Sequence, residues 1–401
     1  MVIGIIGGGA SGMVAALAAA ENPNVQVHLF ERQARVGRKL LATGNGRCNL
    51  TNLHALEGGY HGEEADFANY ALQNFSPEKT LAWFRTLGLF TVAEPSGKVY
   101  PFSDHANSVV DVLRLAMEKE NITLQLGVDV QKVRRKGSVF CINETFECDK
   151  LIIACGGLAG TKLGGSMAGY KLLSKFGHRS TRLRPALVQI KCNWHGSASL
   201  KGVRAECNVK ILQDNSLVKE GRGEIQFTEM GLSGPVMFEL SRDVCAAPGD
   251  WVAELDLLPD YSYDVLLEEL RRRRQTTLPM EELLTGVLHN RLGRVLTKTA
   301  GIQNRKFASE LTDAELADIC KAVKSCQVEL TEPLDMGVAQ VTAGGVYTRD
   351  FDPQTMESKL VPGLYACGEV LDIDGDCGGY NLQWAWSSGY LAGLSAGKES
   401  L

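Results

Sequence analysis

Positive charge is not in excess in this 401-residue chain, which carries 42 lysines and arginines against 47 aspartates and glutamates. Nucleic-acid-binding domains usually have a basic surplus, so a formal net charge of −5 gives no support to a nucleic-acid partner. Aromatic residues are also few, at 7%, whereas hydrophobic residues make up 44%. This hydrophobic content is typical of a folded globular protein and argues against intrinsic disorder.

Paired short cysteine spacings are missing as well. The eleven cysteines are an odd number and include no C-x-x-C, which argues against a zinc site or a small disulfide scaffold. We interpret them mainly as small core residues in a reducing compartment. Asp372, Asp374 and Asp376 suggest a calcium loop, but its sixth and twelfth positions are Cys377 and Gln383 instead of glycine and glutamate. No metal site is predicted.

The N-terminal stretch imitates a signal peptide or a membrane span, because residues 2–20 carry no charge and are mostly apolar. No basic region precedes it, and glycines interrupt it. We therefore expect a strand, a turn and a helix here, no membrane association, and a cytoplasmic protein.

This stretch contains a dinucleotide-binding motif. Residues 2–6 predict a buried strand, and residues 7–12, G-G-G-A-S-G, match G-x-G-x-x-G and lead into a helix of small residues. Gly7 allows the tight turn, Gly9 lets the backbone approach a pyrophosphate, and Gly12 lets helix and strand pack closely. The helix N-terminus offers N–H groups and a partial positive charge to the phosphates.

Glu31 follows a second predicted strand, residues 25–30, and stands 19 residues beyond Gly12. A carboxylate in this position accepts hydrogen bonds from a ribose diol and would repel the 2′-phosphate of NADP. The motif alone does not separate FAD from NAD. Because no second strand–G-x-G-x-x-G–helix unit follows, we expect any NAD(P)H to bind transiently near a flavin.

The C-terminal segment favours FAD. A predicted strand leads to Gly368 and Glu369, and a helix of small residues follows at about 382–396. A carboxylate after a strand can hold the hydroxyls of a ribityl chain, which NAD lacks. The helix would direct its positive N-terminus at one edge of a flavin. The glycine-rich loop 36–52 and the paired glycines after the predicted strand 151–154 also suit close approach to a cofactor.

Several strings in this chain resemble one bacterial flavoprotein family, and the match covers essentially the whole chain. They are residues 43–49 (TGNGRCN), 223–235 (GEIQFTEMGLSGP), 341–346 (VTAGGV) and 363–389. The family includes aminoacetone oxidase and a bile-acid-pathway flavoprotein reductase. The resemblance implies an α/β fold with a discontinuous, Rossmann-like FAD/NAD(P)-binding domain of the glutathione-reductase type, into which a small β-barrel and a helical subdomain are inserted.

The resemblance also implies domain boundaries. The FAD-binding domain would comprise residues 1–187 and 337–401, the β-barrel residues 188–261, and the helical subdomain residues 262–336. The insert has sequence signals of its own. Its first part contains alternating runs separated by turn signals, as in a small barrel. Its second part has leucines at helical spacing among glutamates and arginines.

The expected cofactor-binding residues follow from these motifs and from the resemblance. The glycine-rich turn and the end of the second predicted strand would bind the ADP half of FAD. The loop that follows, residues 36–52, would lie near the pyrophosphate and the flavin. The paired glycines, Gly156 and Gly157, would close over the adenosine side. Glu369 stands where the wider fold usually has an aspartate and would hold the ribityl chain. Tyr380 is expected at the face of the flavin, and Gly379, Asn381 and Leu382 are expected at its pyrimidine edge. The full set is Gly7, Gly9, Ala10, Ser11, Gly12, Glu31, Arg32, Lys39, Thr43, Asn45, Gly46, Asn49, Val130, Gly156, Gly157, Gly368, Glu369, Gly379, Tyr380, Asn381 and Leu382.

Three functions stay open for an enzyme with non-covalently bound FAD. We expect a generic oxidoreductase that transfers a hydride between FAD and a small organic substrate, and the resemblance does not choose between the first two functions. The first takes a hydride from a small substrate such as an amine, as in aminoacetone oxidase, and passes the electrons to oxygen or another acceptor. The second is an NAD(P)H-dependent reductase of an unsaturated or carbonyl substrate. The third is a flavoprotein that modifies or binds RNA, against which the acidic net charge counts.

The sequence does not predict a catalytic residue for any of these three functions. His105, His178 and His195 are candidates for a general base by residue type alone. Cys48 and Cys377 lie in motifs expected near the flavin, but we interpret them as ordinary thiols and not as a redox pair.

Overall fold

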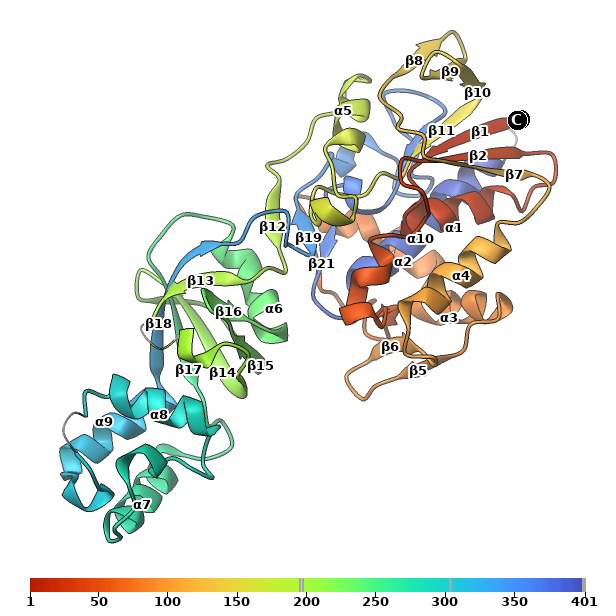
Figure 1. Ribbon diagram of the computed structural model, residues 1–401. Helices are drawn as coiled ribbons and strands as arrows, with labels where there is room; N and C mark the ends of the chain where they lie inside the picture. Colours follow the sequence, from red (N-terminus) through yellow and green to blue (C-terminus); the bar gives the residue numbers. More distant parts are fainter. Residues whose placement is uncertain (195, 197, 303–304, 399–401) are drawn as a thin grey trace. The chain divides into compact units, whose positions relative to one another are not determined.

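The computed structural model describes residues 1–194, 196, 198–302 and 305–398, and the chain divides into two compact units (Figure 1). Unit 1 comprises Met1–Arg184 and Met336–Leu401, and unit 2 comprises Pro185–Asp335. Unit 1 is therefore built from both ends of the chain. Within the described residues, no helix is long and apolar enough to cross a membrane.

Unit 1 is organised around a five-stranded parallel sheet. Its strands lie in the spatial order β20 (Leu364–Ala366), β11 (Lys150–Ile153), β1 (Val2–Ile6), β2 (Gln26–Glu31) and β7 (Ile122–Leu126). The chain order of the strands reverses between β1 and β11. In sheets of this kind, ligands bind outside the carboxyl ends of the strands at such a reversal.

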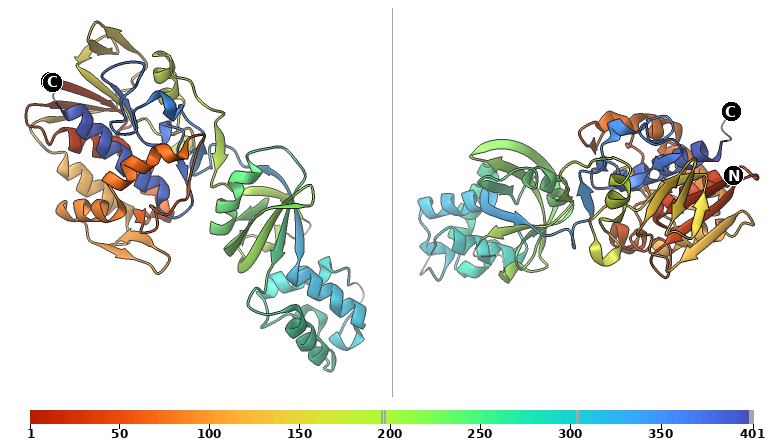
Figure 2. Two further views of the ribbon diagram at one scale, coloured as in Figure 1. Left: turned by 180° about the vertical axis from the view of Figure 1, so that it is seen from behind. Right: turned by 90° about the horizontal axis from the view of Figure 1, so that it is seen from above.

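Two helices of small residues, α1 (Ala10–Ala19) and α10 (Tyr380–Gly397), lie side by side in unit 1 (Figure 2). A Cβ atom on Gly389 would lie 2.4 Å from the carbonyl oxygen of Ser11, and one on Gly393 would lie 2.2 Å from that of Ala15. These contacts advance together along both helices, so the helices run in the same direction. Both N-termini therefore point toward the carboxyl ends of the sheet strands.

Smaller sheets and helices complete unit 1. Two three-stranded antiparallel sheets have the orders β10-β9-β8 and β3-β6-β5, and β4 pairs with β21. The helices of this unit, besides α1 and α10, are α2 (Ala68–Asn74), α3 (Pro77–Thr86), α4 (Ala106–Ala116) and α5 (Ala168–Ser174). The remaining strands are β3 (Thr51–Asn52), β4 (Tyr60–His61), β5 (Thr91–Ala93), β6 (Lys98–Pro101), β8 (Val133–Lys136), β9 (Val139–Ile142), β10 (Phe146–Cys148), β19 (Val341–Ala343) and β21 (Asp374–Gly375).

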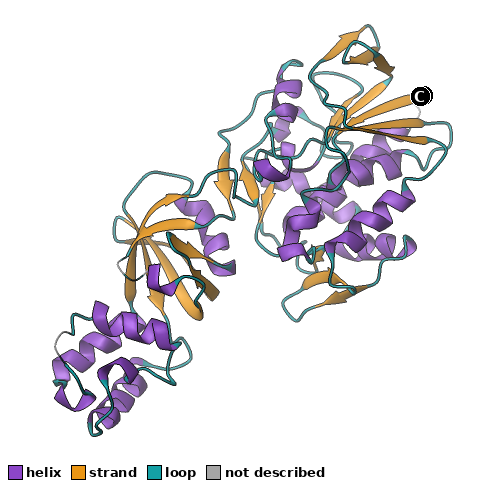
Figure 3. Ribbon diagram, viewed as in Figure 1, coloured by secondary structure: helices purple, strands orange, loops and turns teal. Residues whose placement is uncertain are grey.

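Unit 2 consists of a closed six-stranded barrel and a group of helices (Figure 3). Alternate residues of the barrel strands are buried, such as Trp251, Ala253 and Leu255, as expected for strands with one face in a core. The strands follow the order β13 (Ile190–Asn193), β16 (Gly231–Ser233), β15 (Ser216–Phe227), β14 (Arg204–Gln213), β17 (Trp251–Asp256) and β18 (Cys326–Pro333). The helices are α6 (Pro235–Val244), α7 (Tyr263–Arg274), α8 (Asn290–Thr299) and α9 (Asp313–Lys324), and a short strand, β12 (Arg184–Ala186), stands at the start of the unit.

One barrel strand lies in the region expected to be helical. β18 closes the barrel between β17 and β13, although the expected helical subdomain extended to residue 336. The strand returns to the barrel after α9, so residues 326–333 depart from the sequence-based boundary. Their pairing partners are distant in sequence, and a boundary drawn from local periodicity does not detect them.

Candidate functional site

The glycine-rich turn lies at the carboxyl end of β1, beside the reversal in strand order. Gly7 has φ +110°, and a Cβ atom there would lie 2.4 Å from the carbonyl oxygen of Ala154. A Cβ atom on Gly12 would lie 1.9 Å from the carbonyl oxygen of Gly7. The fold itself therefore requires glycine at these two positions, for the reasons the motif predicts.

Gly9 differs from its neighbours in the turn. A Cβ atom on it would meet no heavy atom within 4 Å, and its φ of −82° suits any residue. Among the glycines of the described residues, it alone combines open space with an ordinary φ. The protein's own packing does not explain a glycine here, whereas a ligand approaching the start of α1 does. Ala10 and Ser11 form the first turn of that helix.

Glu31 stands beside this turn at the end of β2. One carboxylate oxygen accepts a hydrogen bond from the Gly8 N–H, and the other accepts one from the Gln33 N–H, both at 2.8 Å. The carbonyl oxygen of Glu31 accepts a hydrogen bond from the Val128 N–H, two residues before the buried Val130. The segment that follows β7, including Val130, thus lies near the predicted adenosine side.

The Arg32 side chain points toward the loop that follows β11. Its guanidinium donates to the carbonyl oxygen of Gly164 at 2.6 Å. This bond ties the end of β2 to the loop that follows β11 and the paired glycines. A Cβ atom on Gly156 would meet nothing within 4 Å, so this loop also leaves space.

The loop after β2 contains three consecutive residues in the left-handed region, Gly44, Asn45 and Gly46, with φ of 57°, 58° and 87°. Asparagine tolerates this conformation better than most residues. Nearby, Asn49 is buried, and its Oδ1 has no hydrogen-bond partner among the described residues. An unsatisfied buried acceptor is costly, so a hydrogen-bond donor from a ligand would stabilise it. Thr43 instead donates its hydroxyl to the carbonyl oxygen of Leu40.

This loop and the start of α10 are held together although about 330 residues separate them. The side-chain amide of Asn52 donates to the carbonyl oxygen of Gly378 at 2.9 Å, and the Trp386 indole donates to that of Leu50 at 2.8 Å. Gly379 has φ +106°, and a Cβ atom there would lie 2.4 Å from the backbone of Thr51. Glycine is therefore required at 379 by the close approach of two backbones.

Glu369 lies at the centre of the predicted site residues. Its carboxylate accepts hydrogen bonds from the Lys39 ammonium and the Thr342 N–H, each at 2.8 Å. A Cβ atom on Gly157 would lie 2.5 Å from Glu369 Oε1, and one on Gly368 would lie 2.5 Å from Ser11 Oγ. The structure thus brings segments around residues 11, 39, 157 and 369 together. Both Glu369 oxygens have protein partners, and the carboxylate is 20% exposed for contact with a ligand.

The Asn381 side chain is engaged by the protein. Its amide donates to the carbonyl oxygen of Gly375 at 2.7 Å and accepts from the Gly375 N–H at 2.8 Å. Any contact with a ligand at Asn381 and Leu382 would therefore come from the backbone N–H groups of the first helical turn. The Tyr380 ring lies 5.8 Å from the Tyr60 ring, edge to face.

These features fit FAD. The open space at Gly9 suits a pyrophosphate at the start of α1, and the unsatisfied Asn49 oxygen suits a donor on the flavin. The parallel arrangement of α1 and α10 places two helix N-termini toward the same end of the sheet. The individual residue assignments stay predictions.

A pair of side chains that the sequence did not suggest lies in this region. β4 pairs with β21 just before α10, and the His61 Nε2 lies 2.7 Å from Asp376 Oδ1. β4 is only two residues long, so no local periodicity marks it. The tight run of glycines around it, 58, 59 and 62, was the available signal of a close approach between backbones.

Of the three histidines singled out by type, the structure describes His105 and His178, and neither makes a hydrogen bond to a predicted site residue. His105 is exposed at the start of α4. His178 is buried, its Nε2 lies 2.9 Å from Ser358 Oγ, and its ring stacks on Phe351, which gives it a structural role. His195 lies outside the described residues.

Cys48 gives no sign of thiol chemistry. Cys48 is fully buried, and burial raises the pKa of its thiol to about 12, so it is protonated at neutral pH.

Over the described part of the chain, no group of three or more histidine, cysteine, aspartate or glutamate side chains is placed to bind a metal ion.

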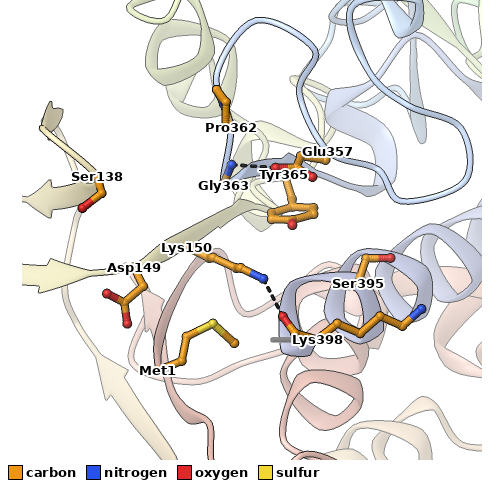
Figure 4. A pocket seen from close by; sticks show the side chains of 10 residues that line it. All are labelled: Met1, Ser138, Asp149, Lys150, Glu357, Pro362, Gly363, Tyr365, Ser395 and Lys398. Atoms are coloured by element: carbon orange, nitrogen blue, oxygen red, sulfur yellow. Dashed lines mark hydrogen bonds between the residues drawn. The ribbon is translucent and has the colours of Figure 1, made fainter. Parts of the chain in front are cut away.

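A pocket of about 600 Å³ lies at the opposite edge of the sheet (Figure 4). Its lining includes Met1, Lys150 and Gly363, which stand at or just before the amino ends of β1, β11 and β20. The Lys150 ammonium donates to the carbonyl oxygens of Ala396 and Lys398, at 3.0 and 2.7 Å, and so satisfies the end of α10. This pocket is distant from the predicted cofactor edge, and its lysine has a structural task.

Known proteins match the chain over nearly its full length. The family model described as "HI0933-like protein Rossmann domain" matches residues 1–395. The 3-dehydro-bile acid delta(4,6)-reductase of Clostridium scindens is 39% identical over 408 residues, which cover 99% of each chain. The ribosomal RNA dihydrouridine synthase of Escherichia coli is 32% identical over 404 residues, which cover 99% of this chain and 98% of that protein.

Among solved structures, the 3-ketosteroid delta1-dehydrogenase of Sterolibacterium denitrificans is similar in fold. It has a TM-score of 0.50 and 13% sequence identity, and the match covers 98% of this chain and 99% of that one. At this identity the likeness concerns the fold alone.

Proposed function

Because the chain belongs to the HI0933-like Rossmann-domain family and is an FAD-dependent oxidoreductase, we propose that it reduces a carbon–carbon double bond conjugated to a carbonyl group. The substrate would be a small organic molecule, and NAD(P)H would supply the electrons. The chemistry shared by two relatives carries this proposal. A delta(4,6)-reductase of a 3-dehydro bile acid reduces ring double bonds next to a ketone, and a dihydrouridine synthase reduces the uracil double bond next to a carbonyl.

This proposal selects one of the two directions of hydride transfer that the sequence left open. An aminoacetone-oxidase-like enzyme would remove a hydride from its substrate, whereas both named relatives add hydrogen to theirs. The same flavin site serves either direction. The lack of a second dinucleotide motif agrees with transient binding of NAD(P)H.

The charge distribution supports a small substrate over ribosomal RNA. Unit 2 carries 18 lysines and arginines against 23 aspartates and glutamates, and unit 1 carries 24 of each kind. Binding to RNA relies on neutralisation of phosphates by basic side chains. Neither unit has a surplus of such side chains, and the inserted unit would repel a polyanion.

The chain's own residues would hold and polarise the cofactor. FAD, when bound, supplies two-electron transfer through its flavin ring. Glu31 would orient the adenosine ribose, and Glu369, held by Lys39, would orient the ribityl chain. The positive N-terminus of α10 would stabilise negative charge at the pyrimidine edge of the ring.

A cytoplasmic location is part of the proposal. All eleven cysteines are free in the structure, and several of them are buried in the core. This state suits a reducing compartment.

Anaerobic flavin spectroscopy tests the proposed function. The purified holoenzyme would be mixed with NADH or NADPH, and the visible flavin absorption followed until it bleaches. A 3-oxo-4,6-diene steroid acid would then be added, with the corresponding saturated 3-oxo acid as the matched control. We expect the diene, and not the saturated acid, to restore the oxidised spectrum and to gain hydrogen.

Two results would contradict the proposal. If neither nucleotide bleaches the flavin but a small amine does, the enzyme works in the oxidative direction. If a ribosomal RNA transcript restores the oxidised spectrum and the diene does not, the substrate class is wrong although the conjugated reduction is right.

A further inference from the structure

We propose that His61, positioned by Asp376, is the proton donor of this reduction, an inference that rests on the proposed function. Hydride addition to a conjugated double bond forms one C–H bond and moves an electron pair toward the carbonyl, which leaves an enolate. A proton must then reach the other carbon of the former double bond. In the step we assign to His61, its N–H bond breaks, the second C–H bond forms, and the neutral imidazole later regains a proton from water.

The backbone places His61 beside the predicted flavin edge. Its strand, β4, pairs with β21 in the register His61 to Asp374 and Tyr60 to Gly375. The Asp376 N–H also donates to the carbonyl oxygen of Gly59 at 2.8 Å. The segment thus runs along the residues between Glu369, the predicted ribityl partner, and the first turn of α10, the predicted partner of the pyrimidine edge.

The side chains are arranged for proton delivery. His61 Nε2 lies 2.7 Å from Asp376 Oδ1, and this bond leaves Nδ1 to face a different direction. A carboxylate on one ring nitrogen fixes the orientation and the tautomer of an imidazole. The His61 side chain is 28% exposed and that of Asp376 is 35% exposed, so water can return the proton.

Asp376 is itself held in place by its backbone. Besides the bond to Gly59, its carbonyl oxygen accepts a hydrogen bond from the Asn381 amide at 3.3 Å. Because these contacts do not involve the carboxylate, an Asp376→Asn substitution changes the partner of His61 without removing the anchors of the loop. This separation makes the positioning role testable.

Other groups near the predicted flavin edge are less suited to the task. Tyr60 donates its hydroxyl to the carbonyl oxygen of Tyr380, and burial, with Tyr380 and Asp376 nearby, raises its pKa well above the usual value. It therefore holds its proton firmly. A second histidine–carboxylate pair, His54 with Glu57, is far more exposed, at 50% and 73%, and is formed by near neighbours in the chain.

His61→Gln, with His54→Gln as the matched control, tests the proposal in the holoenzyme. We expect His61→Gln to bind FAD and to be bleached by NAD(P)H at the wild-type rate. Reoxidation of its reduced flavin by the diene acid should slow by about 10²–10⁴-fold, the usual contribution of a general acid. His54→Gln should match the wild type in both half-reactions.

Asp376→Asn tests the positioning role through a readout that does not depend on turnover. In ¹⁵N-histidine NMR spectra of the holoenzyme, the Nε2 signal of His61 should move in Asp376→Asn relative to the wild type, because the carboxylate that holds this nitrogen is replaced by an amide. Reoxidation of the reduced flavin by the diene acid should also slow in Asp376→Asn. Tyr60 and Asp374 also lie on the paired strands, and Glu63, Asp372 and Tyr380 lie close to them in the chain. The wild type and Asp376→Asn both keep these five residues, so the comparison reports on Asp376 alone.

The outcomes distinguish the two proposals. If the diene reoxidises the wild type and His61→Gln equally fast, the proton-donor role is refuted and the proposed function stands. If Tyr380→Phe loses reoxidation while His61→Gln keeps it, the donor is the tyrosine and our assignment is wrong. If the diene fails to reoxidise even the wild type, the proposed function fails. Should His61→Gln lose FAD, an unchanged Nε2 signal of His61 in Asp376→Asn would still refute the pairing.

Discussion

Substitution of Gly9 separates folding from cofactor binding at a single position. A Cβ atom there meets no heavy atom within 4 Å, and φ −82° with ψ −168° is extended backbone that any residue adopts. Gly9 is the N-cap of α1, where alanine and valine are somewhat poorer than glycine. Loss of glycine also restricts the unfolded chain, which stabilises by about 0.4–1 kcal/mol. The two effects oppose each other, so the free energy of unfolding of the apoprotein should change by less than about 1 kcal/mol.

The affinity for FAD should change much more. A side chain at position 9 would occupy the space in which the pyrophosphate approaches the N–H groups of α1. The loss of a hydrogen bond to a charged group costs about 1.5–3 kcal/mol, which corresponds to a roughly tenfold to hundredfold higher Kd. The Kd for FAD should rise more in Gly9→Val than in Gly9→Ala, because the branched valine side chain fills more of the space. Calorimetric titration of the apoprotein with FAD, alongside urea unfolding, measures both quantities.

Two further glycines serve as controls for this experiment. Gly223→Ala introduces a Cβ atom 3.4 Å from that of Val236, an ordinary contact in the barrel, and should leave FAD affinity unchanged. Gly12→Ala would place a Cβ atom 1.9 Å from the Gly7 carbonyl oxygen and should lower stability. Wild-type FAD affinity in Gly9→Val would refute the placement of the pyrophosphate at this turn.

Three other substitutions test separate parts of the structure. Glu369→Ala should weaken FAD binding by removing the predicted ribityl partner and the carboxylate that holds Lys39; an unchanged Kd in the same titration would contradict that placement. Cys48→Ser should keep steady-state turnover per bound FAD, because a thiol with a pKa of about 12 supplies no thiolate; a large loss would reinstate thiol chemistry. Burial lowers the pKa of His178 in the folded state, although Asp350 opposes this, so the unfolded chain binds a proton first as pH falls below about 6.5. Stability in urea should therefore decline through that range, and less steeply in His178→Gln; equal slopes would show that His178 is not responsible.

The features that sequence could predict are those that depend on neighbouring residues. The G-x-G-x-x-G motif lies within one short segment, so its spacing is visible in the sequence, and the structure shows the contacts that require its glycines: a Cβ atom on Gly12 would meet Gly7, and one on Gly7 would meet Ala154. The α/β Rossmann-like fold, the FAD cofactor and the oxidoreductase class were predicted and are confirmed. A helix was expected at about 382–396, and α10 spans Tyr380–Gly397.

The features that sequence missed depend on pairing between distant segments. His61 meets Asp376 through two strands of two residues each, which are too short to show a period of alternation. The Asp372–Asp376 run drew attention as a metal loop, whereas its last carboxylate contacts a histidine 315 residues away. β18 was missed for a similar reason, since α7, α8 and α9 separate it from its partner β17, and its other partner, β13, lies still earlier in the chain.

The parallel packing of α1 and α10 explains why the two ends of the chain form one site. Gly389 and Gly393 let α10 lie against the backbone of α1, so the relative height of the two helices is determined by backbone contact and not by adaptable side chains. The N-terminus of α1 would bind the pyrophosphate, and that of α10 would face the flavin. The distance between these two helix ends would have to match the span of the bound cofactor from its pyrophosphate to its flavin ring. The glycines of α10 would therefore influence the position of the flavin, although they lie far from the N-terminus of the helix.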